Sequence, residues 1–130
     1  MELNLETVKS LLPQYGYTPI DSDDVLINLA IEKVTNYVLI WCNITSIPHK
    51  LIPEMLDMVC GEFLYRKAGM NALSDGGLTF EKGVSSISEG DTSVSFHKNR
   101  NTDEEIFIEF LNELRKGRNE VLEQFRKLKW

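Results

Sequence analysis

Two successive stretches with apolar residues at helical spacing restrict this chain to a mainly helical fold. In the first stretch the apolar residues recur every three or four positions, which predicts a helix over residues 23–42. Further apolar residues widen its apolar face, and a face this wide is typical of a helix at the centre of a core. The second stretch predicts a helix over residues 50–68. The apolar positions are Leu26, Leu29, Ala30, Val34, Tyr37, Val38 and Trp41 in the first, and Ile52, Met55, Leu56, Val59, Cys60, Phe63 and Leu64 in the second.

The link between these two helices contains two prolines. Either Pro48 or Pro53 can occupy the first turn of the second helix, where the missing N–H costs nothing, so the sequence leaves the start of that helix open. A link of this length is typical of antiparallel neighbours, and we expect the two helices to pack as a hairpin. Gly61, inside the second helix, costs about 1 kcal/mol relative to Ala, which predicts the close approach of another helix there.

Helices are also expected at the two ends of the chain. Residues 4–12 form a brief amphipathic pattern. Thr102 followed by Glu105 is a capping box, and the apolar pattern behind it predicts a helix over residues 103–128 that Gly117 can bend. At about 1.5 Å per residue this helix would be roughly 40 Å long. Part of its apolar face therefore has to meet more than one neighbouring helix.

The segment before the last helix departs from the helical period. Residues 69–83 contain several glycines and scattered apolar residues, which predicts a long mobile loop. In residues 84–96, VSSISEGDTSVSF, apolar residues alternate with serines around Glu89-Gly90-Asp91, which predicts two short strands joined by a tight turn. Such a hairpin is barely stable alone and needs a covering partner. We therefore expect a mainly all-α single domain of residues 1–130, a small bundle of about four helices with a long loop and a short β-hairpin before the last helix.

Length and composition are those of a globular domain. The chain has 130 residues and is 42% hydrophobic, which suffices for one core. The longest apolar run, residues 25–44, is interrupted by charged and polar residues, and residues 1–10 lack the pattern of a signal peptide. We therefore expect no membrane segment and a cytoplasmic location. Cys42 and Cys60 fall on apolar helical faces without a CxxC pattern and are expected to be buried, reduced thiols.

Charge is distributed unevenly along the chain. The net charge of −6 and the pI near 4.9 disfavour a nucleic-acid-binding protein. Asp and Glu outnumber Lys and Arg in residues 1–57, and the balance reverses in residues 114–130. An acidic body with a basic end suits head-to-tail packing of identical subunits or docking on an acidic partner. The alternative is that these cations only complement the dipole of a helix C-terminus.

No pattern of catalytic or ligand-binding residues is supported by its context. The chain lacks a phosphate-binding loop sequence and any nucleophile, base and acid placed on suitable elements. His49 and His97 are far apart, and a pair such as His97 with Asp91 arises by chance in loops. Adjacent acids such as Asp23 and Asp24 are better explained as charge at a helix N-terminus. We therefore expect no catalytic residue, no cofactor, no metal and no enzymatic activity.

The order of these features resembles that of a known family. Four features follow one another along nearly the whole chain. They are a central helix pair joined through Ile47-Pro48, a Gly-rich loop, the segment Ile87–Phe96 (ISEGDTSVSF), and a capped last helix ending in Phe125–Trp130 (FRKLKW). In this order the chain is similar to the small head-to-tail connector proteins, also called head-completion or adaptor proteins, of tailed bacteriophages and of prophages in Gram-positive bacteria.

The resemblance implies a structural, non-enzymatic virion protein. Such proteins form a ring under the portal protein, join the DNA-filled head to the tail, and extend a channel that DNA passes without specific binding. The implied partners are further copies of the chain, the portal protein and a tail or stopper protein, with no membrane; the implied locations are the cytoplasm of the bacterial host and the head-to-tail junction of the virion. The assembly residues expected on this basis are Ile87, Glu89, Gly90, Asp91, Thr92, Val94, Phe125, Arg126, Lys127, Lys129 and Trp130.

A second class of function stays open at this point, namely a small helical prophage-encoded regulatory or protein-binding module. A ring former should give particles, at least at high concentration or with its portal, whereas a regulator should remain a monomer or dimer. Under the connector hypothesis the isolated subunit is expected to be largely monomeric. Residues 126–130 are then expected to attach the subunit to the portal and to add no more than about 1 kcal/mol to folding, because chain ends fray.

Overall fold

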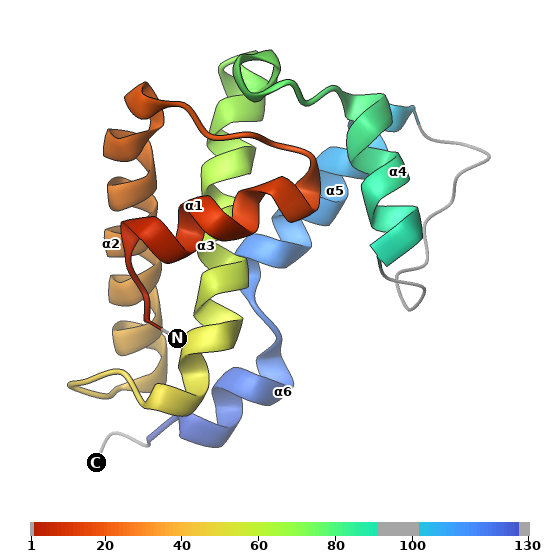
Figure 1. Cartoon of the computed structure of the whole chain (residues 1–130). Helices are drawn as coiled ribbons and strands as arrows, with labels where there is room; N and C mark the ends of the chain where they lie inside the picture. Colours follow the sequence, from red (N-terminus) through yellow and green to blue (C-terminus); the bar gives the residue numbers. More distant parts are fainter. Residues whose placement is uncertain (1, 91–101, 128–130) are drawn as a thin grey trace.

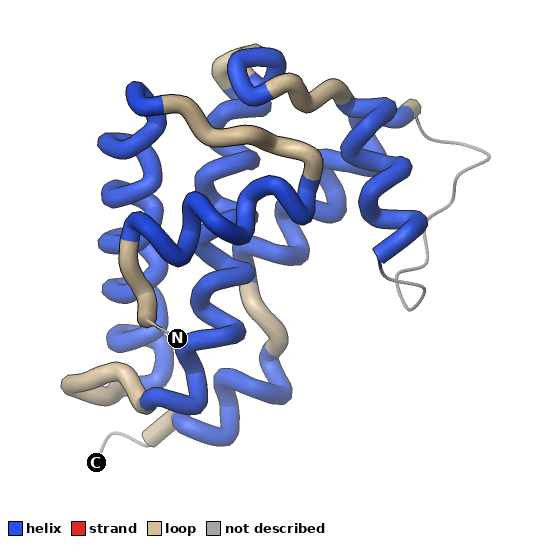
Figure 2. The backbone as a smooth tube through the Cα atoms, in the orientation of Figure 1, coloured by secondary structure: helices blue, strands red, loops and turns tan. Residues whose placement is uncertain are grey.

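The computed structural model describes residues 2–90 and 102–127, with the backbone alone for residues 86–90. The elements are the helices α1 (Leu5–Leu11), α2 (Asp24–Cys42), α3 (Ile52–Gly69), α4 (Phe80–Gly90), α5 (Asp103–Lys116) and α6 (Asn119–Leu122), with 3-10 turns at Leu12–Tyr15, Asp21–Asp23, His49–Leu51, Leu73–Gly76 and Glu123–Phe125. Helix α3 packs against both α2 and α5, and α1 crosses in front of α2 and α3 (Figure 1). Helices and loops account for all the described residues, with no strand among them (Figure 2), so the predicted all-α class is confirmed.

Helices α2 and α3 form the predicted antiparallel hairpin, within two residues of the expected bounds (Figure 1). Helix α2 ends where Asn43 takes a left-handed conformation (φ 55°) and donates its N–H to the carbonyl of Ile40. Both prolines of the link are used at the start of α3. Pro48 precedes the 3-10 turn that leads into the helix, and Pro53 lies in the first turn of the helix itself.

Helix α3, rather than α2, is the central helix. Met55, Met58 and Phe63 have no exposed surface, because α3 has neighbours on several sides. Gly61 lets α5 come close, since a Cβ at this position would lie 2.8 Å from the backbone nitrogen of Arg115. The close approach predicted from Gly61 is therefore confirmed. Helix α2 lies at the edge of the bundle, where its wide apolar face is only partly covered (Figure 1).

The single long helix predicted over residues 103–128 is broken into two. Helix α5 begins at the predicted capping box but ends at Lys116, because Gly117 takes a positive φ of 75° that interrupts the helix. Arg118 then donates its backbone N–H and its Nε to the buried carboxylate of Glu54, at 3.2 and 2.9 Å. These contacts hold the chain beside the first turn of α3, and Leu122 of α6 is fully buried. The C-terminal part of the apolar pattern therefore packs within the bundle of the same subunit.

The stretch between α3 and α4 is more regular than the loop predicted over residues 69–83, because Leu73–Gly76 forms a 3-10 turn and α4 begins at Phe80; its mobility stays a prediction. Leu73 and Leu78 are buried in the core. The backbone N–H of Thr18 donates to the carbonyl of Gly76 at 2.9 Å, which ties this stretch to the N-terminal segment. Apolar residues without periodicity are enough to anchor such a connection, although they predict no regular element.

Helix α4 replaces the first half of the predicted β-hairpin, since residues 84–90 are helical. The ring of Phe80 packs edge-on against Phe107 of α5, with 6.3 Å between ring centroids, and Val84 packs against the core. The apolar spacing in so short a segment fits a helix as well as a strand, and the contact with α5 favours the helix. Residues 91–96, the second half of the hairpin, lie outside the described residues.

Candidate functional site

The structure does not bring the two predicted groups of assembly residues together. Ile87, Glu89 and Gly90 lie in the C-terminal half of α4, at one side of the bundle, while α6, which leads to the described residues of the tail, lies away from α4 (Figure 1). The remaining predicted residues outside the described part of the chain are Asp91, Thr92, Val94, Lys129 and Trp130.

Some of the predicted assembly residues lie in the described part of the C-terminal tail, and they contact the end of α2. The backbone N–H of Lys127 donates to the carbonyl of Cys42 at 2.7 Å. The guanidinium of Arg126 lies 4.7 Å from the centre of the Trp41 ring, a cation–π contact, and Phe125 packs against the core. Residues 125–127 therefore contact the folded body, and the expectation that folding hardly depends on the tail from Arg126 onward stays a prediction.

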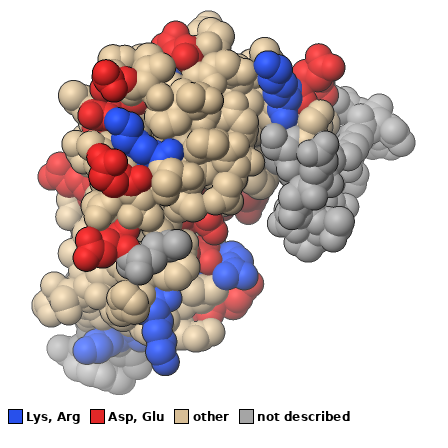
Figure 3. Space-filling view, viewed as in Figure 1, with Lys and Arg blue, Asp and Glu red and all other residues tan. Residues whose placement is uncertain are grey.

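One face of α2 carries apolar side chains that the bundle leaves exposed. Val25 is 75% exposed and Ile40 is 78% exposed, and the less exposed Leu29 and Tyr37 extend the same face. We call Val25, Leu29, Tyr37 and Ile40 the outer α2 face. Around it, Asp and Glu side chains gather along the edge of the molecule where α2 lies (Figure 3). The sequence pattern gave α2 a wide apolar face, but it could not tell which part of that face stays uncovered.

Residues Asp21–Cys42, with a mean hydropathy of 1.4 in an 18-residue window, form the one helical stretch of the described chain long and apolar enough to cross a membrane. The charged and polar interruptions of the apolar run therefore leave it apolar enough for such a helix, and the absence of a membrane segment stays a prediction. Length and composition alone do not separate a membrane helix from a core helix. In the bundle Val34 and Val38 are buried, and α2 packs against α3.

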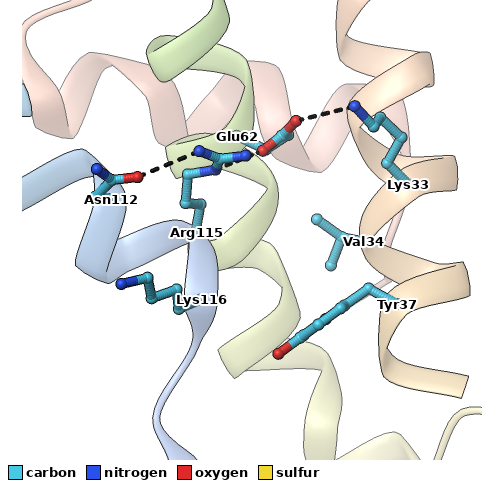
Figure 4. Close-up of a pocket in the computed structure, with 7 residues that line it drawn as sticks. All are labelled: Lys33, Val34, Tyr37, Glu62, Asn112, Arg115 and Lys116. Carbon is cyan, nitrogen blue, oxygen red and sulfur yellow. Dashed lines mark hydrogen bonds and ion pairs between the residues drawn. The ribbon is translucent and has the colours of Figure 1, made fainter. Parts of the chain in front are cut away.

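A groove lies between α2, α3 and α5, with a cavity volume of about 350 Å³. Lys33, Val34 and Tyr37 point into it from α2, as Figure 4 shows. The other lining residues, Glu62 from α3 and Asn112, Arg115 and Lys116 from α5, stand opposite (Figure 4). We call this the α2–α5 groove.

A buried carboxylate organises the α2–α5 groove. Glu62 accepts a hydrogen bond from Arg115 Nε at 2.8 Å and pairs with Lys33 Nζ at 3.5 Å. The guanidinium of Arg115 also donates to Asn112 Oδ1 at 3.2 Å and lies 4.2 Å from the centre of the Tyr65 ring. These contacts hold Arg115 in one orientation. The guanidinium is therefore a pre-positioned donor at the wall of the groove.

Positive charge exceeds negative charge in the α2–α5 groove. Lys33, Arg115 and Lys116 face a single carboxylate, that of Glu62. The side chains of Lys33 and Lys116 are 52% and 66% exposed, so their ammonium groups are accessible from solvent. In a protein with a net charge of −6, this groove can hold an anionic group. Sequence reasoning missed it because its residues are distant in the chain; the basic last turn of α5 was its only local sign.

A second ionic cluster is centred on a buried ion pair, Asp23 with Lys67. Lys67 Nζ pairs with Asp23 Oδ1 at 3.0 Å and with Asp75 Oδ2 at 3.1 Å, and Tyr17 donates its hydroxyl to Asp23 Oδ2 at 2.7 Å. Burial alone would raise the pKa of Asp23, but hydrogen bonds from Tyr17, Lys67 and the Ile20 N–H outweigh it and lower that pKa. Burial together with the bond to Asp23 raises the pKa of Tyr17 to about 12. Because Asp23 and Lys67 are almost fully buried, this closed cluster joins segments rather than binding a ligand.

Metal and thiol chemistry find little support in the part of the chain that the structure describes. Both cysteines are buried free thiols, as predicted. Burial raises the pKa of Cys60 to about 12, so the thiol stays protonated and is a poor nucleophile and metal ligand. Within residues 2–90 and 102–127, no group of three or more His, Cys, Asp or Glu side chains is placed to hold a metal ion.

The chain was also compared with family models, with curated proteins and with solved structures, and none of them matched it.

Proposed function

We propose that this protein is a structural subunit of a phage or prophage head-to-tail connector that forms a ring under the portal protein and joins the DNA-filled head to the tail. The proposal starts from the order of sequence features that resembles this family. Its partners are further copies of the chain, the portal protein and a tail or stopper protein. Its role is assembly, without enzymatic activity.

The observation that carries the proposal is the outer α2 face. The described part of the bundle is well satisfied internally, with no buried side-chain nitrogen or oxygen lacking a hydrogen-bond partner. Val25 and Ile40 nevertheless remain largely in water. Burying such a side chain fully contributes about 1.5–3 kcal/mol. A helix with this face at the edge of a stable subunit suits contact with neighbouring subunits, which a ring supplies at every position.

The surface charge supports the same role. Acidic side chains predominate along the edge that α2 forms (Figure 3). If acidic side chains that the subunit contacts leave exposed line a channel, they repel phosphates and let DNA slide past without specific binding. A basic surface would instead retain the DNA.

The test is assembly of the purified chain, alone at high concentration and with the portal protein of the same prophage, followed by negative-stain electron microscopy and sedimentation. We expect ring particles from the wild type, and we expect Val25→Glu with Ile40→Glu to abolish them while the subunit stays folded. Asn28→Glu, an exposed position on a neighbouring side of α2, is the matched control and should leave the rings intact. A wild-type chain that stays monomeric or dimeric even with the portal contradicts the proposal and supports the regulatory or protein-binding alternative.

A further inference from the structure

The α2–α5 groove has more hydrogen-bond donors than its own carboxylate can use. Glu62 is already shared by Arg115, Lys33 and Arg66. Among the described residues, Lys116 has only an exposed pair with Glu113 at 3.9 Å, and the Tyr37 hydroxyl forms no hydrogen bond. Such exposed pairs contribute little to stability. The donors that face the groove are thus available to a carboxylate from a binding partner. Val34 and Tyr37 add apolar surface that can contact the aliphatic part of the side chain bearing this carboxylate.

The charges of α5 are separated along its length. Asp103, Glu104 and Glu105 form its exposed first turn, and Arg115 and Lys116 lie in its last turn at the groove. The helix dipole favours this order of charges within one helix. It does not account for Lys33 and Tyr37, which come from α2 and face the same groove (Figure 4).

We infer that the α2–α5 groove of one subunit receives the acidic first turn of α5 from a second copy of this chain. The inference rests on the proposed function, because it supplies the subunit contact that a ring needs. Carboxylates of Asp103 and Glu104 bind Lys33 and Lys116, and Arg115 holds the wall in position. Charge complementarity between the two ends of one helix selects another copy as the occupant.

This contact is heterologous, because the surface that binds differs from the surface that is bound. Repeated contacts of this kind close into a ring when the rotation between subunits allows it and otherwise grow as a filament. Tyr37 belongs to both the groove and the outer α2 face, so the two surfaces are continuous. The ion pairs set the orientation of the neighbour, and the apolar face adds buried area.

Charge reversal in the full chain tests the inference. We expect Lys33→Glu with Lys116→Glu to weaken self-association at least about tenfold, measured by sedimentation, and Asp103→Lys with Glu104→Lys to do the same. All four substitutions in one chain should restore assembly, because the pairs re-form with opposite signs. The control, Lys50→Glu with Lys82→Glu, reverses two cations outside the groove and should have no such effect.

A neutral variant tests whether a loss of association comes only from unfolding. Lys33→Glu places a second carboxylate near Glu62, so Lys33→Gln with Lys116→Gln is measured beside it, with circular dichroism to confirm folding. If these variants assemble like the wild type, or if the fourfold variant fails to recover, the groove contact is refuted while the proposed ring function stands. If the wild type never self-associates, with or without portal, both are refuted.

Discussion

The closed cluster and the α2–α5 groove are both built around a buried carboxylate, yet they differ in their balance of charge and in access. In the closed cluster one ammonium group, that of Lys67, is shared by Asp23 and Asp75; Lys67 and Asp23 are buried, and the Asp75 side chain is 49% exposed at the edge. In the groove one carboxylate, that of Glu62, is shared by three cations, those of Lys33, Arg66 and Arg115, whose side chains reach solvent. In the closed cluster the cation is fully paired within the subunit, whereas the groove keeps cations that a partner can still bind.

The comparison teaches how to separate a structural ion pair from a binding site. A buried charge whose partners are all internal costs much when one partner is removed, because the remaining charge is left without solvation. Removing the partner of a solvent-exposed cation changes the free energy of unfolding little, because water then solvates the cation. Stability measurements should therefore respond to the closed cluster, and association measurements should respond to the groove.

The largest expected effect comes from breaking the closed cluster. Asp23→Ala removes the acceptor of Tyr17 and one of the two partners of Lys67, and we expect a loss of about 3 kcal/mol in the free energy of unfolding, measured by urea denaturation. Asp24→Ala, which removes the more exposed partner of Lys9, is the control and should cost clearly less. Equal losses in the two variants would show that Asp23 is not part of a buried ion pair that stabilises the fold.

Acid should remove the same contribution in the unmutated protein. The pKa of Asp23 is lowered below its ordinary value of 3.8 in the folded chain, so its stabilisation is present above about pH 4 and is lost as the pH falls through the lower, folded-state pKa. We therefore expect the difference in unfolding free energy between the wild type and Asp23→Asn to shrink below about pH 4. Denaturation curves at several pH values measure it. A difference that does not change with pH would speak against an ionised Asp23.

Arg126 lies between these two cases, because its side chain is exposed to solvent and its guanidinium also stacks on the ring of Trp41. Removing residues 126–130 should lower the free energy of unfolding by about 1–2 kcal/mol more than removing residues 128–130, because only the longer deletion loses this stacking and the hydrogen bond to Cys42. The two truncated chains are compared by chemical denaturation. Equal stability would return the tail to the role first expected of it, attachment without folding.

The smallest effect on folding is expected at the rim of the groove. Lys33→Gln with Lys116→Gln should change the free energy of unfolding by no more than about 0.5 kcal/mol, because both side chains are more than half exposed. The measurement is again a denaturation curve, set beside the sedimentation data. A large loss would mean that these cations serve the fold, and the contrast with the closed cluster would disappear.

Much of the helical framework could be predicted from local patterns. The periods that define α2 and α3, the capping box before α5 and the meaning of Gly61 all depend on residues within a few positions of one another. The predictions that failed depend on partners far along the chain. Residues 84–90 are helical where they pack near α5, and the last helix ends where Glu54 of α3 binds Arg118.

By itself the sequence determined where most helices lie, that the chain is mainly α-helical, and that its two cysteines are buried, because side-chain period and capping act over a single turn of helix. Only the tertiary structure decided that α3 is central, that part of α2 stays uncovered, and that Lys33, Glu62 and Arg115 meet at one groove. Those outcomes depend on how three helices pack. The free energy that selects one packing comes from contacts between residues that no local pattern connects.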